Sequence, residues 1–286
     1  MNLMVKSVSD THELFNGLPS RRITLSNGDS LTVVRQGAQL VSWVSVGRER
    51  LYLSPHNTYD GHTPIRGGVP ICFPQFNQRG SLPKHGFVRN LSWQVDEATP
   101  GGEPEAQLTL RLSANADTQA LWPARFELAL HLHLQPGQLQ ITLALRNTGD
   151  ESLSFTGALH TYLAVNNIAA TQLRGLDGQP EWDAVADVHG RAADPLHFNG
   201  EFDRVYNAAH QALTLQDTSS SLSIEQSSSF ANTVVWNPGA QKGAALVDMP
   251  KDGYQDMLCV EASQVMQPVV VKAGDEWLGW QRLSVL

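Results

Sequence analysis

The sequence is poor in cysteine and lacks long apolar runs. Its 286 residues include two cysteines, Cys72 and Cys259. Two are too few for a disulfide framework, and we expect both to be buried free thiols. No apolar run is long enough to span a bilayer, and the N-terminal segment MNLMVKSVSDTHE has no apolar signal core. These absences predict a cytoplasmic protein that does not enter a membrane.

Positive charge is also scarce, except in one stretch. The formal net charge is −8, which argues against nucleic acid or an anionic membrane as a partner. From Gly61 to Val95, however, there is no aspartate or glutamate, while four bases occur there: Arg66, Arg79, Lys84 and Arg89. This local excess fits either a solvated basic loop or an anion site.

The same stretch is rich in proline and glycine. Between Thr63 and Trp93 the sequence contains four prolines, the pair Gly67-Gly68 and two further glycines. Such a density predicts an irregular backbone without helix or regular strand. Long loops of this kind in compact domains are often functional.

Elsewhere the sequence alternates in a way typical of strands. Apolar residues recur at every second position from Phe126 to Leu134 and again from Leu139 to Leu145, on either side of a Pro136-Gly137 turn. This predicts a long antiparallel hairpin with one apolar face. Many other short strands with turn signals between them, and no long amphipathic helix, predict an all-β fold, a large antiparallel sandwich or barrel. We expect one domain over residues 1–286, with a loop-rich segment at 174–210.

Motifs for common cofactor chemistry are missing. There is no P-loop, no HExxH, no cysteine cluster and no nucleophile elbow. His131 and His133 form an H-x-H pair on one strand face, but no third ligand is evident nearby. We therefore expect no metal at these histidines, and a metal-dependent β-barrel enzyme using them is the weaker interpretation.

Two other residues lie in apolar strand-like runs. His160 follows Phe155–Leu159, and Glu261 lies between Val260 and Ala262. A carboxylate in such a run is costly to desolvate unless it is paired or used. Taken alone, each residue fits a structural role as well as a catalytic one.

Six motifs, in order along the chain, resemble those of the hexose-6-phosphate mutarotases. These enzymes are glucose-6-phosphate 1-epimerases, relatives of the aldose 1-epimerases. The motifs, which span Ile65 to Ser263, are IRGGVPICFPQF, KHGFVRN, ALHTYL, FDRVY, VVWNP and CVEAS. The resemblance implies a large antiparallel β-sandwich of the galactose mutarotase type and an isomerase without cofactor.

The resemblance also implies roles for individual residues. His160 of ALHTYL is similar to the general acid and Glu261 of CVEAS to the general base. The substrate-binding residues that it implies are Arg66 and Arg89 as a phosphate clamp, Asp203 as an acceptor for sugar hydroxyls, and Lys84, His85 and Asn237 as further polar contacts.

This reading predicts interconversion of the α and β anomers of an aldohexose 6-phosphate, with D-glucose 6-phosphate as the expected substrate. A base and an acid suffice to open and reclose the sugar ring, each contributing about 10²–10⁴-fold. The expected partner is this small sugar phosphate, and we expect a monomer. Two alternatives remain: an epimerase of non-phosphorylated aldoses, and a non-catalytic carbohydrate-binding sandwich.

Overall fold

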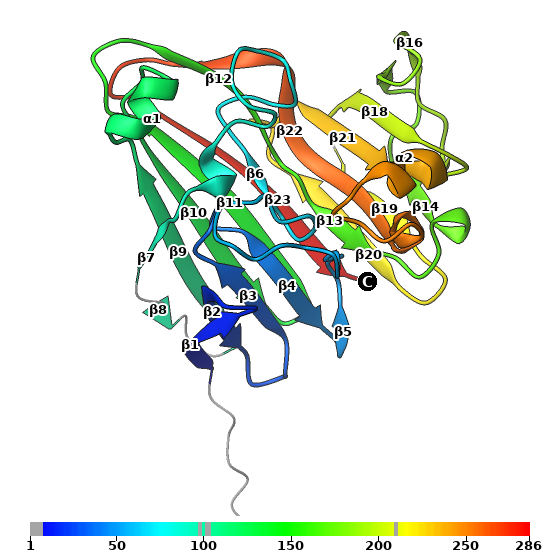
Figure 1. The fold of residues 1–286 in the computed structure, drawn as a ribbon. Helices are drawn as coiled ribbons and strands as arrows, with labels where there is room; N and C mark the ends of the chain where they lie inside the picture. Colours follow the sequence, from blue (N-terminus) through cyan, green and yellow to red (C-terminus); the bar gives the residue numbers. More distant parts are fainter. Residues whose placement is uncertain (1–7, 97–98, 101–103, 209–210) are drawn as a thin grey trace, which may run out of the picture.

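Antiparallel strands make up most of the chain, as its alternation predicts (Figure 1). The computed structural model describes residues 8–96, 99–100, 104–208 and 211–286. The first seven residues, part of the segment expected to carry no signal sequence, lie outside the described residues. Within the described part, no helix has the length and apolar character needed to cross a membrane.

The Leu-rich hairpin forms the centre of the largest sheet. β10 (Phe126–Gln135) pairs with β11 (Gln138–Asn147), and the leucines of both strands are buried. Gly137 has a φ of 73° in the turn between them, a conformation that glycine adopts without strain. The alternation therefore predicted both the hairpin and its buried face correctly.

Ten strands belong to this sheet. Its order is β17-β14-β19-β20-β23-β11-β10-β9-β7, and β8 pairs with β9. Besides β10 and β11, its strands are β7 (Gln94–Val95), β8 (Thr99–Pro100), β9 (Ala106–Ser113), β14 (Gln172–Arg174), β17 (Leu196–His197), β19 (Leu213–Gln216), β20 (Ser221–Gln226) and β23 (Glu276–Val285).

An eight-stranded sheet packs against the first. Its order is β16-β15-β18-β21-β22-β12-β6, and β13 pairs with β22. Its strands are β6 (Ile71–Cys72), β12 (Leu153–Leu159), β13 (Tyr162–Ala164), β15 (Pro180–Asp183), β16 (Val188–Arg191), β18 (Phe202–Asn207), β21 (Asn232–Asn237) and β22 (Met257–Val271).

A third sheet is formed by the N-terminal part of the chain. It contains β1 (Ser9–Phe15), β2 (Leu18–Thr24), β3 (Ser30–Val34), β4 (Leu40–Ser45) and β5 (Arg48–Glu49), paired in sequence order. One cluster of buried apolar residues draws from all three sheets, for example Trp43, Leu130 and Val260. The sheets thus enclose a common core, and the fold is the antiparallel β-sandwich that was predicted.

Helices are few and short in the described part of the chain. They are α1 (Ala116–Leu121), α2 (Gly239–Ala245) and the 3₁₀ turns η1 (Val88–Asn90), η2 (Ile168–Ala170) and η3 (Gly253–Asp256). Helix α1 and its C-cap residue Trp122 end at Pro123, which cannot continue the helix.

The segment predicted to be loop-rich, 174–210, is less irregular over residues 174–208 than predicted, and residues 209–210 lie outside the described residues. It contains β15, β16, β17 and β18, of which β15 and β16 form the outer edge of the eight-stranded sheet. All four residues of β16 are exposed. An edge strand without a buried face needs no apolar alternation, which is why the sequence pattern did not reveal it.

Candidate functional site

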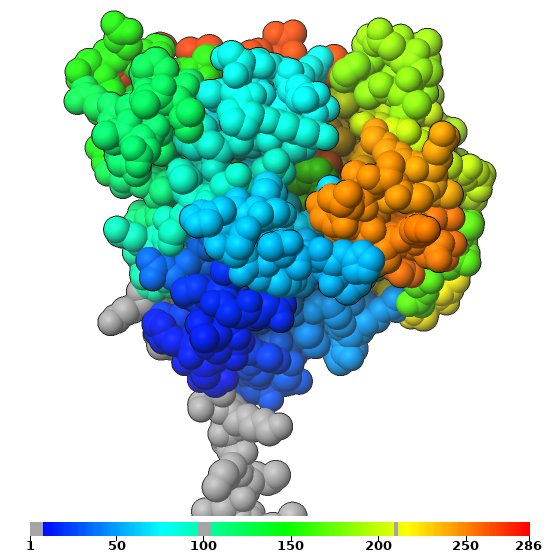
Figure 2. Space-filling view, in the orientation of Figure 1, coloured from blue at the N-terminus to red at the C-terminus, as the bar shows by residue number. Residues whose placement is uncertain are grey.

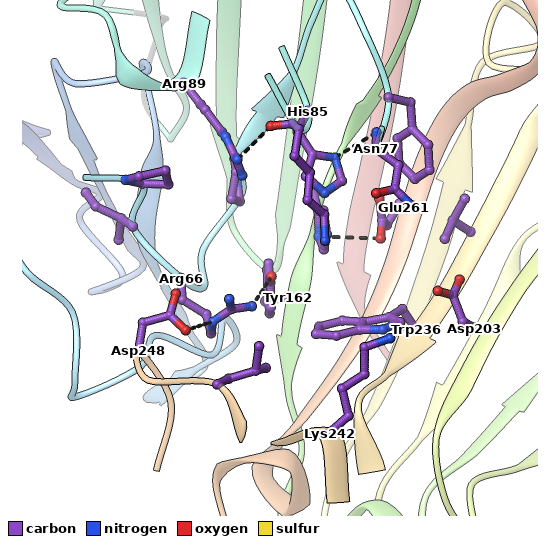
Figure 3. Close-up of a pocket in the computed structure, with 18 of the residues that line it drawn as sticks. Arg66, Asn77, His85, Arg89, Tyr162, Asp203, Trp236, Lys242, Asp248 and Glu261 are labelled. Atoms are coloured by element: carbon purple, nitrogen blue, oxygen red, sulfur yellow. Dashed lines mark hydrogen bonds and ion pairs between the residues drawn. The ribbon is translucent and has the colours of Figure 1, made fainter. Parts of the chain in front are cut away.

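A cavity of about 290 Å³ opens between the basic stretch and helix α2. Figure 2 shows it as a recess between the cyan segments and the orange α2 region. Its floor is the face of the eight-stranded sheet that points away from the common core. Polar side chains from several distant segments converge on it (Figure 3).

Strand alternation decides which side chains reach this floor. Val234 pairs with Glu261 across β21 and β22, and both line the cavity. Trp236, two residues further along β21, lines it as well and pairs with Asp203 of β18. Val235, which lies between Val234 and Trp236 on β21, and its partner Val260 on β22 point into the common core. Because side chains alternate between the two faces of a strand, Glu261 faces the cavity while its neighbours Val260 and Ala262 pack into the core.

The two candidate catalytic residues meet on this floor. His160 Nδ1 lies 3.4 Å from Glu261 Oε1, although 101 positions separate the residues in the sequence. The backbone N–H of His160, just after β12, donates to the Pro70 carbonyl (3.0 Å). Its ring stacks on Tyr162 at a centroid distance of 4.7 Å with an interplanar angle of 8°, which fixes the orientation of the imidazole.

Both residues of this pair are buried, with exposures of 8% and 1%. His160 Nδ1 and Glu261 Oε2 have no hydrogen-bond partner among the described residues. Buried polar atoms are nearly always satisfied, and both of these residues line the cavity. A bound molecule with hydroxyl groups would supply the missing partners.

Burial also controls the protonation of the pair. It raises the pKa of Glu261 well above its usual range, and the charge of Asp203 adds to this shift. Burial lowers the pKa of His160 well below its usual range, and His85, when it is protonated, Arg89 and Arg66 act in the same direction. A carboxyl and an imidazole shifted in these directions hold one proton between them without net charge.

Arg66 is followed by two glycines whose backbone packs closely against neighbouring segments. A Cβ on Gly67 would lie 2.4 Å from the Tyr52 carbonyl oxygen, and one on Gly68 would lie 2.1 Å from that of Leu40. The guanidinium donates through Nε to Asp248 Oδ1 (2.7 Å). Only glycine leaves room for the backbone at positions 67 and 68. The Arg66 side chain reaches the cavity already paired with Asp248.

His85 presents a defined ring nitrogen to the cavity. The backbone N–H of Asn77 donates to His85 Nδ1 (3.2 Å). Because a backbone N–H can only donate, the proton of the neutral imidazole is on Nε2. Burial first, and then the charges of Arg89, Lys84 and Arg66, lower the pKa of His85 to about 3. His85 is therefore a neutral hydrogen-bond donor at neutral pH.

Lys84 and Arg89 form the least compensated positive charge of the site. Arg89 Nη2 donates to the Lys84 carbonyl oxygen (2.8 Å), and neither side chain forms an ion pair with an acid of the described residues. Desolvation, followed by the charges of Lys242, Arg66 and Arg89, lowers the pKa of Lys84. Crowded like charges of this kind are typical of an anion site.

Asp203 lies on the opposite wall, beside Trp236 (Figure 3). Burial raises the pKa of its carboxyl, and Lys242 and Lys84 oppose that shift. Its carboxylate oxygens make no hydrogen bond to the described residues, so they are available to accept hydroxyl groups from a bound molecule.

Seven of the eight predicted site residues line the cavity, and Asn237 does not. Its Nδ2 donates to the carbonyls of Tyr254 and Met257 (2.8 Å each), and its Oδ1 accepts from the Gly239 N–H (2.8 Å). Alternation along β21 turns it away from Trp236, so its side chain holds the start of α2. We therefore do not include Asn237 among the residues proposed to contact a substrate.

Three further residues named in the sequence analysis lie outside the cavity. Arg79 is exposed, donates to the Val265 carbonyl (2.9 Å) and lies 4.9 Å from the centre of the Trp182 ring. His131 bonds Thr109 Oγ1 (2.9 Å), and His133 bonds Glu105 Oε2 (2.9 Å). Neither histidine belongs to a group of three metal-ligating side chains in the described part of the chain.

Polar residues of the cavity that sequence reasoning did not single out include Tyr162, Lys242 and Asp248. Tyr162 belongs to the motif ALHTYL, two residues after His160. Strand alternation places it on the same side as His160, so the sequence did contain a signal for it. Lys242 and Asp248 come from α2 and the residues after it, a short segment rich in glycine and alanine. Lys242 Nζ bonds Glu201 Oε1 (2.5 Å). No pattern in this segment marks either residue.

In the described part of the chain, one group of three potential metal ligands combines two residues that line the cavity with Cys259, which is buried beside them and does not line it. The ligand atoms of His160, Cys259 and Glu261 all lie within 4.8 Å of one another, and all three residues are buried. Both cysteines are free and buried, as predicted.

Comparison with known proteins gives matches over nearly the whole chain. Residues 21–284 match a family model described as "Aldose 1-epimerase". A protein of Cenchrus ciliaris named "Putative glucose-6-phosphate 1-epimerase" is 34% identical over 261 residues, which cover 87% of this chain and 79% of that protein. A protein of the same name from Escherichia coli K12 is 34% identical over 235 residues, 80% of this chain and 77% of its own.

Solved structures agree with the fold. The crystal structure of a "putative mutarotase" from Salmonella typhimurium superposes with a TM-score of 0.85 at 28% identity, covering 97% of this chain and 96% of that one. A galactose mutarotase-like protein from Clostridium acetobutylicum gives a TM-score of 0.77 at 13% identity, covering 98% and 99%. At that identity the second likeness concerns the fold alone.

Proposed function

The chain belongs to the aldose 1-epimerase family, and on this premise we propose that it interconverts the α and β anomers of an aldohexose 6-phosphate, with D-glucose 6-phosphate as the expected substrate. The observation that carries the proposal is the buried His160–Glu261 pair, 3.4 Å apart, on the floor of a cavity that is also lined by Arg66, Lys84, Arg89 and Lys242. The names of the relatives from Cenchrus ciliaris and Escherichia coli, both "Putative glucose-6-phosphate 1-epimerase", support the same substrate.

The reaction requires two proton transfers and no nucleophile. In one direction Glu261 takes the proton of the C1 hydroxyl while His160 donates a proton to the ring oxygen, and the C1–O5 bond breaks to give an aldehyde. Rotation about C1–C2 presents the other face of the carbonyl. O5 then attacks C1, returns its proton to His160, and the new C1 oxygen recovers a proton from Glu261.

One proton shared by the pair therefore suffices for both directions. Bound phosphate would offset the charges of Arg66 and Arg89, which are among the causes of the low pKa of His160. Substrate binding would thus favour the protonated imidazole that ring opening needs. The unpaired oxygen of Glu261 and the carboxylate of Asp203 face the cavity as acceptors for the sugar hydroxyls.

The charges of the cavity support a phosphorylated sugar. Lys84 and Arg89 have no acidic partner in the described part of the chain, and a phosphate dianion would be their natural counter-ion. Asp203 and the Trp236 ring on the other wall suit the hydroxyl groups and C–H face of a sugar ring. The phosphate would bind towards the basic stretch and C1 towards His160 and Glu261.

The experiment is anomer exchange of glucose 6-phosphate, measured by exchange NMR with and without the protein. We expect His160→Ala and Glu261→Gln each to reduce the catalysed rate by about 100-fold or more. His62→Ala and Glu127→Gln, at exposed positions, are the matched controls and should retain wild-type rates. Circular dichroism melts verify that the variants are folded. Wild-type rates in both cavity variants would remove the proposed mechanism.

One observation favours an epimerase of free aldoses as the second candidate. Asp248 already offsets part of the charge of Arg66 (2.7 Å), which weakens the case for that arginine as a phosphate ligand. A comparison of kcat/KM for galactose, glucose and glucose 6-phosphate decides between the two. Saturable sugar binding in calorimetry without any anomer exchange would instead indicate the non-catalytic sandwich.

A further inference from the structure

A thiol that the proposed reaction does not use lies beside the acid–base pair. Cys259 is two residues before Glu261 on β22, so both side chains leave the same face of the strand. Cys259 is fully buried among Tyr52, Tyr162 and other residues of a small cluster. Packing alone would be served equally well by an apolar residue at this position.

The geometry of the three side chains is close to that of a metal site. Donor atoms about 2.0–2.3 Å from a tetrahedral zinc ion are roughly 3.3–3.6 Å apart. His160 Nδ1 and Glu261 Oε1 are already 3.4 Å apart, and all three donors lie within 4.8 Å of one another. Side-chain rotations that move the donor atoms by about 1 Å would bring the sulfur, nitrogen and oxygen ligands to these separations.

A second observation concerns unsatisfied atoms, among them Glu261 Oε2, which takes no part in the 3.4 Å contact. His160 Nδ1 and Glu261 Oε2 are buried without a hydrogen-bond partner in the described part of the chain. Both residues line the cavity, whose open side leaves a fourth coordination position for water. Thiolate and imidazole ligands select Zn²⁺ over Mg²⁺ or Ca²⁺, which prefer oxygen ligands alone.

We propose that His160, Cys259 and Glu261 form a zinc-binding site at the floor of the cavity, and that zinc bound there inhibits the enzyme. Bound zinc would occupy the imidazole nitrogen and the carboxylate that must move protons. Its role as an inhibitor rests on the proposed function, whereas the binding site itself does not.

Charge balance allows a cation in this basic cavity. Before binding, the three side chains carry the thiol proton and one proton shared by the acid–base pair. Zn²⁺ displaces both protons to solvent and is then held by one thiolate, one carboxylate and a neutral imidazole, so the floor stays without net charge. The cations Arg66, Lys84 and Arg89 therefore do not repel the completed site.

Binding is tested on the full-length protein after chelator treatment, by competition for Zn²⁺ with a chromophoric chelator. We expect one tight site in the wild type. Cys259→Ser should weaken it by about tenfold or more, because a hydroxyl is a poor zinc ligand compared with a thiolate. Cys72→Ser is the matched control, since Cys72 is the other buried thiol, and it should bind like the wild type. Equal binding by all three proteins would overturn the site.

Cobalt gives a measurement that needs no variant. Co²⁺ added to the wild type should produce the near-ultraviolet absorption of a thiolate-to-cobalt charge transfer and the visible bands of a tetrahedral ion. A spectrum without thiolate absorption would also overturn the site, whether or not Cys259→Ser folds.

Anomer exchange then separates the two proposals. Zn²⁺ should inhibit the wild type and Cys72→Ser, with recovery on adding EDTA, and the inhibiting concentration for Cys259→Ser, taken relative to its own rate, should be about tenfold higher or more. Zinc bound through Cys259 in a protein without anomerase activity would leave the site standing and remove the proposed function. Full activity with saturating zinc bound through Cys259 would overturn the inhibition.

Discussion

Arg89 and Arg66 enter the same cavity with different partners, and this difference predicts unequal roles. Arg66 already donates to Asp248 (2.7 Å), whereas Arg89 donates only to a backbone carbonyl (2.8 Å). The Arg89 Nε is buried and has no partner among the described residues. The guanidinium of Arg89 is therefore the one that an incoming phosphate would satisfy.

We predict that Arg89→Ala raises KM for glucose 6-phosphate by about 10- to 100-fold, the equivalent of a charge-assisted hydrogen bond, and changes KM for free glucose little. Arg66→Ala should have the smaller effect. Arg79→Ala is the matched control, because this arginine lies in the same basic stretch but outside the cavity. Steady-state anomerisation of both sugars checks this, and equal KM changes for the two sugars in Arg89→Ala would contradict it.

His85 links the same basic stretch to the pH dependence of stability. Its pKa is about 3 in the folded protein, lowered by burial and by Arg89, Lys84 and Arg66, against an ordinary value of about 6.5 in the unfolded chain. Below about pH 6.5, His85 is protonated in the unfolded chain but stays neutral in the folded protein until the pH approaches 3. The contribution of His85 to stability is therefore present at neutral pH and is lost as the pH falls towards 3.

The slope of this loss is at most about 1.4 kcal/mol per pH unit for a single group. We predict that the free energy of unfolding of His85→Asn falls less steeply between pH 6.5 and 4 than that of the wild type, in urea titrations. His62→Asn, at an exposed position, should keep the wild-type slope. Parallel curves for wild type and His85→Asn would show that the ring is protonated in the folded state.

At the scale of elements, the basic stretch is held mainly by backbone contacts outside regular strands, apart from the two residues of β6 that pair with β12. Phe87 N–H donates to the Phe73 carbonyl (3.1 Å), and Phe73 N–H donates to the His85 carbonyl (3.2 Å). Gly86 lies between them with a φ of 72°, and a Cβ there would be 2.0 Å from the Phe73 oxygen. Glycine is required here both by its conformation and by the close approach of two chain segments.

Gly137 provides a matched control for this argument. Its φ is 73°, almost the same as that of Gly86, but a Cβ there would meet nothing within 4 Å. We predict that Gly137→Ala costs about 1–2 kcal/mol, the strain of a left-handed alanine, and that Gly86→Ala costs clearly more. Denaturant unfolding measures both, and similar losses would mean that the Phe73 carbonyl moves aside at little cost.

Strands with one buried face were the elements that the sequence predicted best. The alternation from Phe126 to Leu134 determined strand, face and partner at once, because a shift by one residue would expose every leucine. The segment 174–210 lacked such a signal, since β15 and β16 form an edge with little to bury. Helix α2 was missed for another reason: it is one short element, its N-cap position is Pro238 without a side-chain cap, and the Asn237 side chain holds its first N–H instead. Its Lys242 acts only through its position across the cavity.

At the scale of the whole molecule, convergence could not be predicted from composition. Arg66, His160, Asp203 and Glu261 are brought together by the order β18-β21-β22-β12-β6 and by the loop that lies over it. Pattern analysis gives the faces of strands but not their neighbours in a sheet. The resemblance to a known family predicted instead which residues share a site. Seven of its eight residues line one cavity, whereas the Asn237 side chain bonds backbone groups near α2.

The uneven distribution of charge leads to a prediction about salt. The chain carries a net charge of −8, yet Arg66, Lys84, Arg89 and Lys242 all line one cavity. A sugar phosphate is thus repelled by the molecule at long range and attracted at the cavity mouth, where the low-dielectric walls focus the local field. Raising the ionic strength from about 0.01 M to about 0.5 M shortens the screening length from about 30 Å to under 10 Å.

We predict that this change lowers kcat/KM for glucose 6-phosphate several-fold, because at the mouth the short-range attraction exceeds the diffuse repulsion, and leaves kcat/KM for free glucose unchanged. Arg89→Ala should flatten the salt dependence for the phosphate ester, whereas Arg79→Ala should retain it. Anomer exchange over a series of salt concentrations measures all four cases. An increase with salt would mean that the net charge of the molecule dominates the encounter, and an equal decrease for both sugars would point to an effect of salt on the fold instead of on the charged cavity.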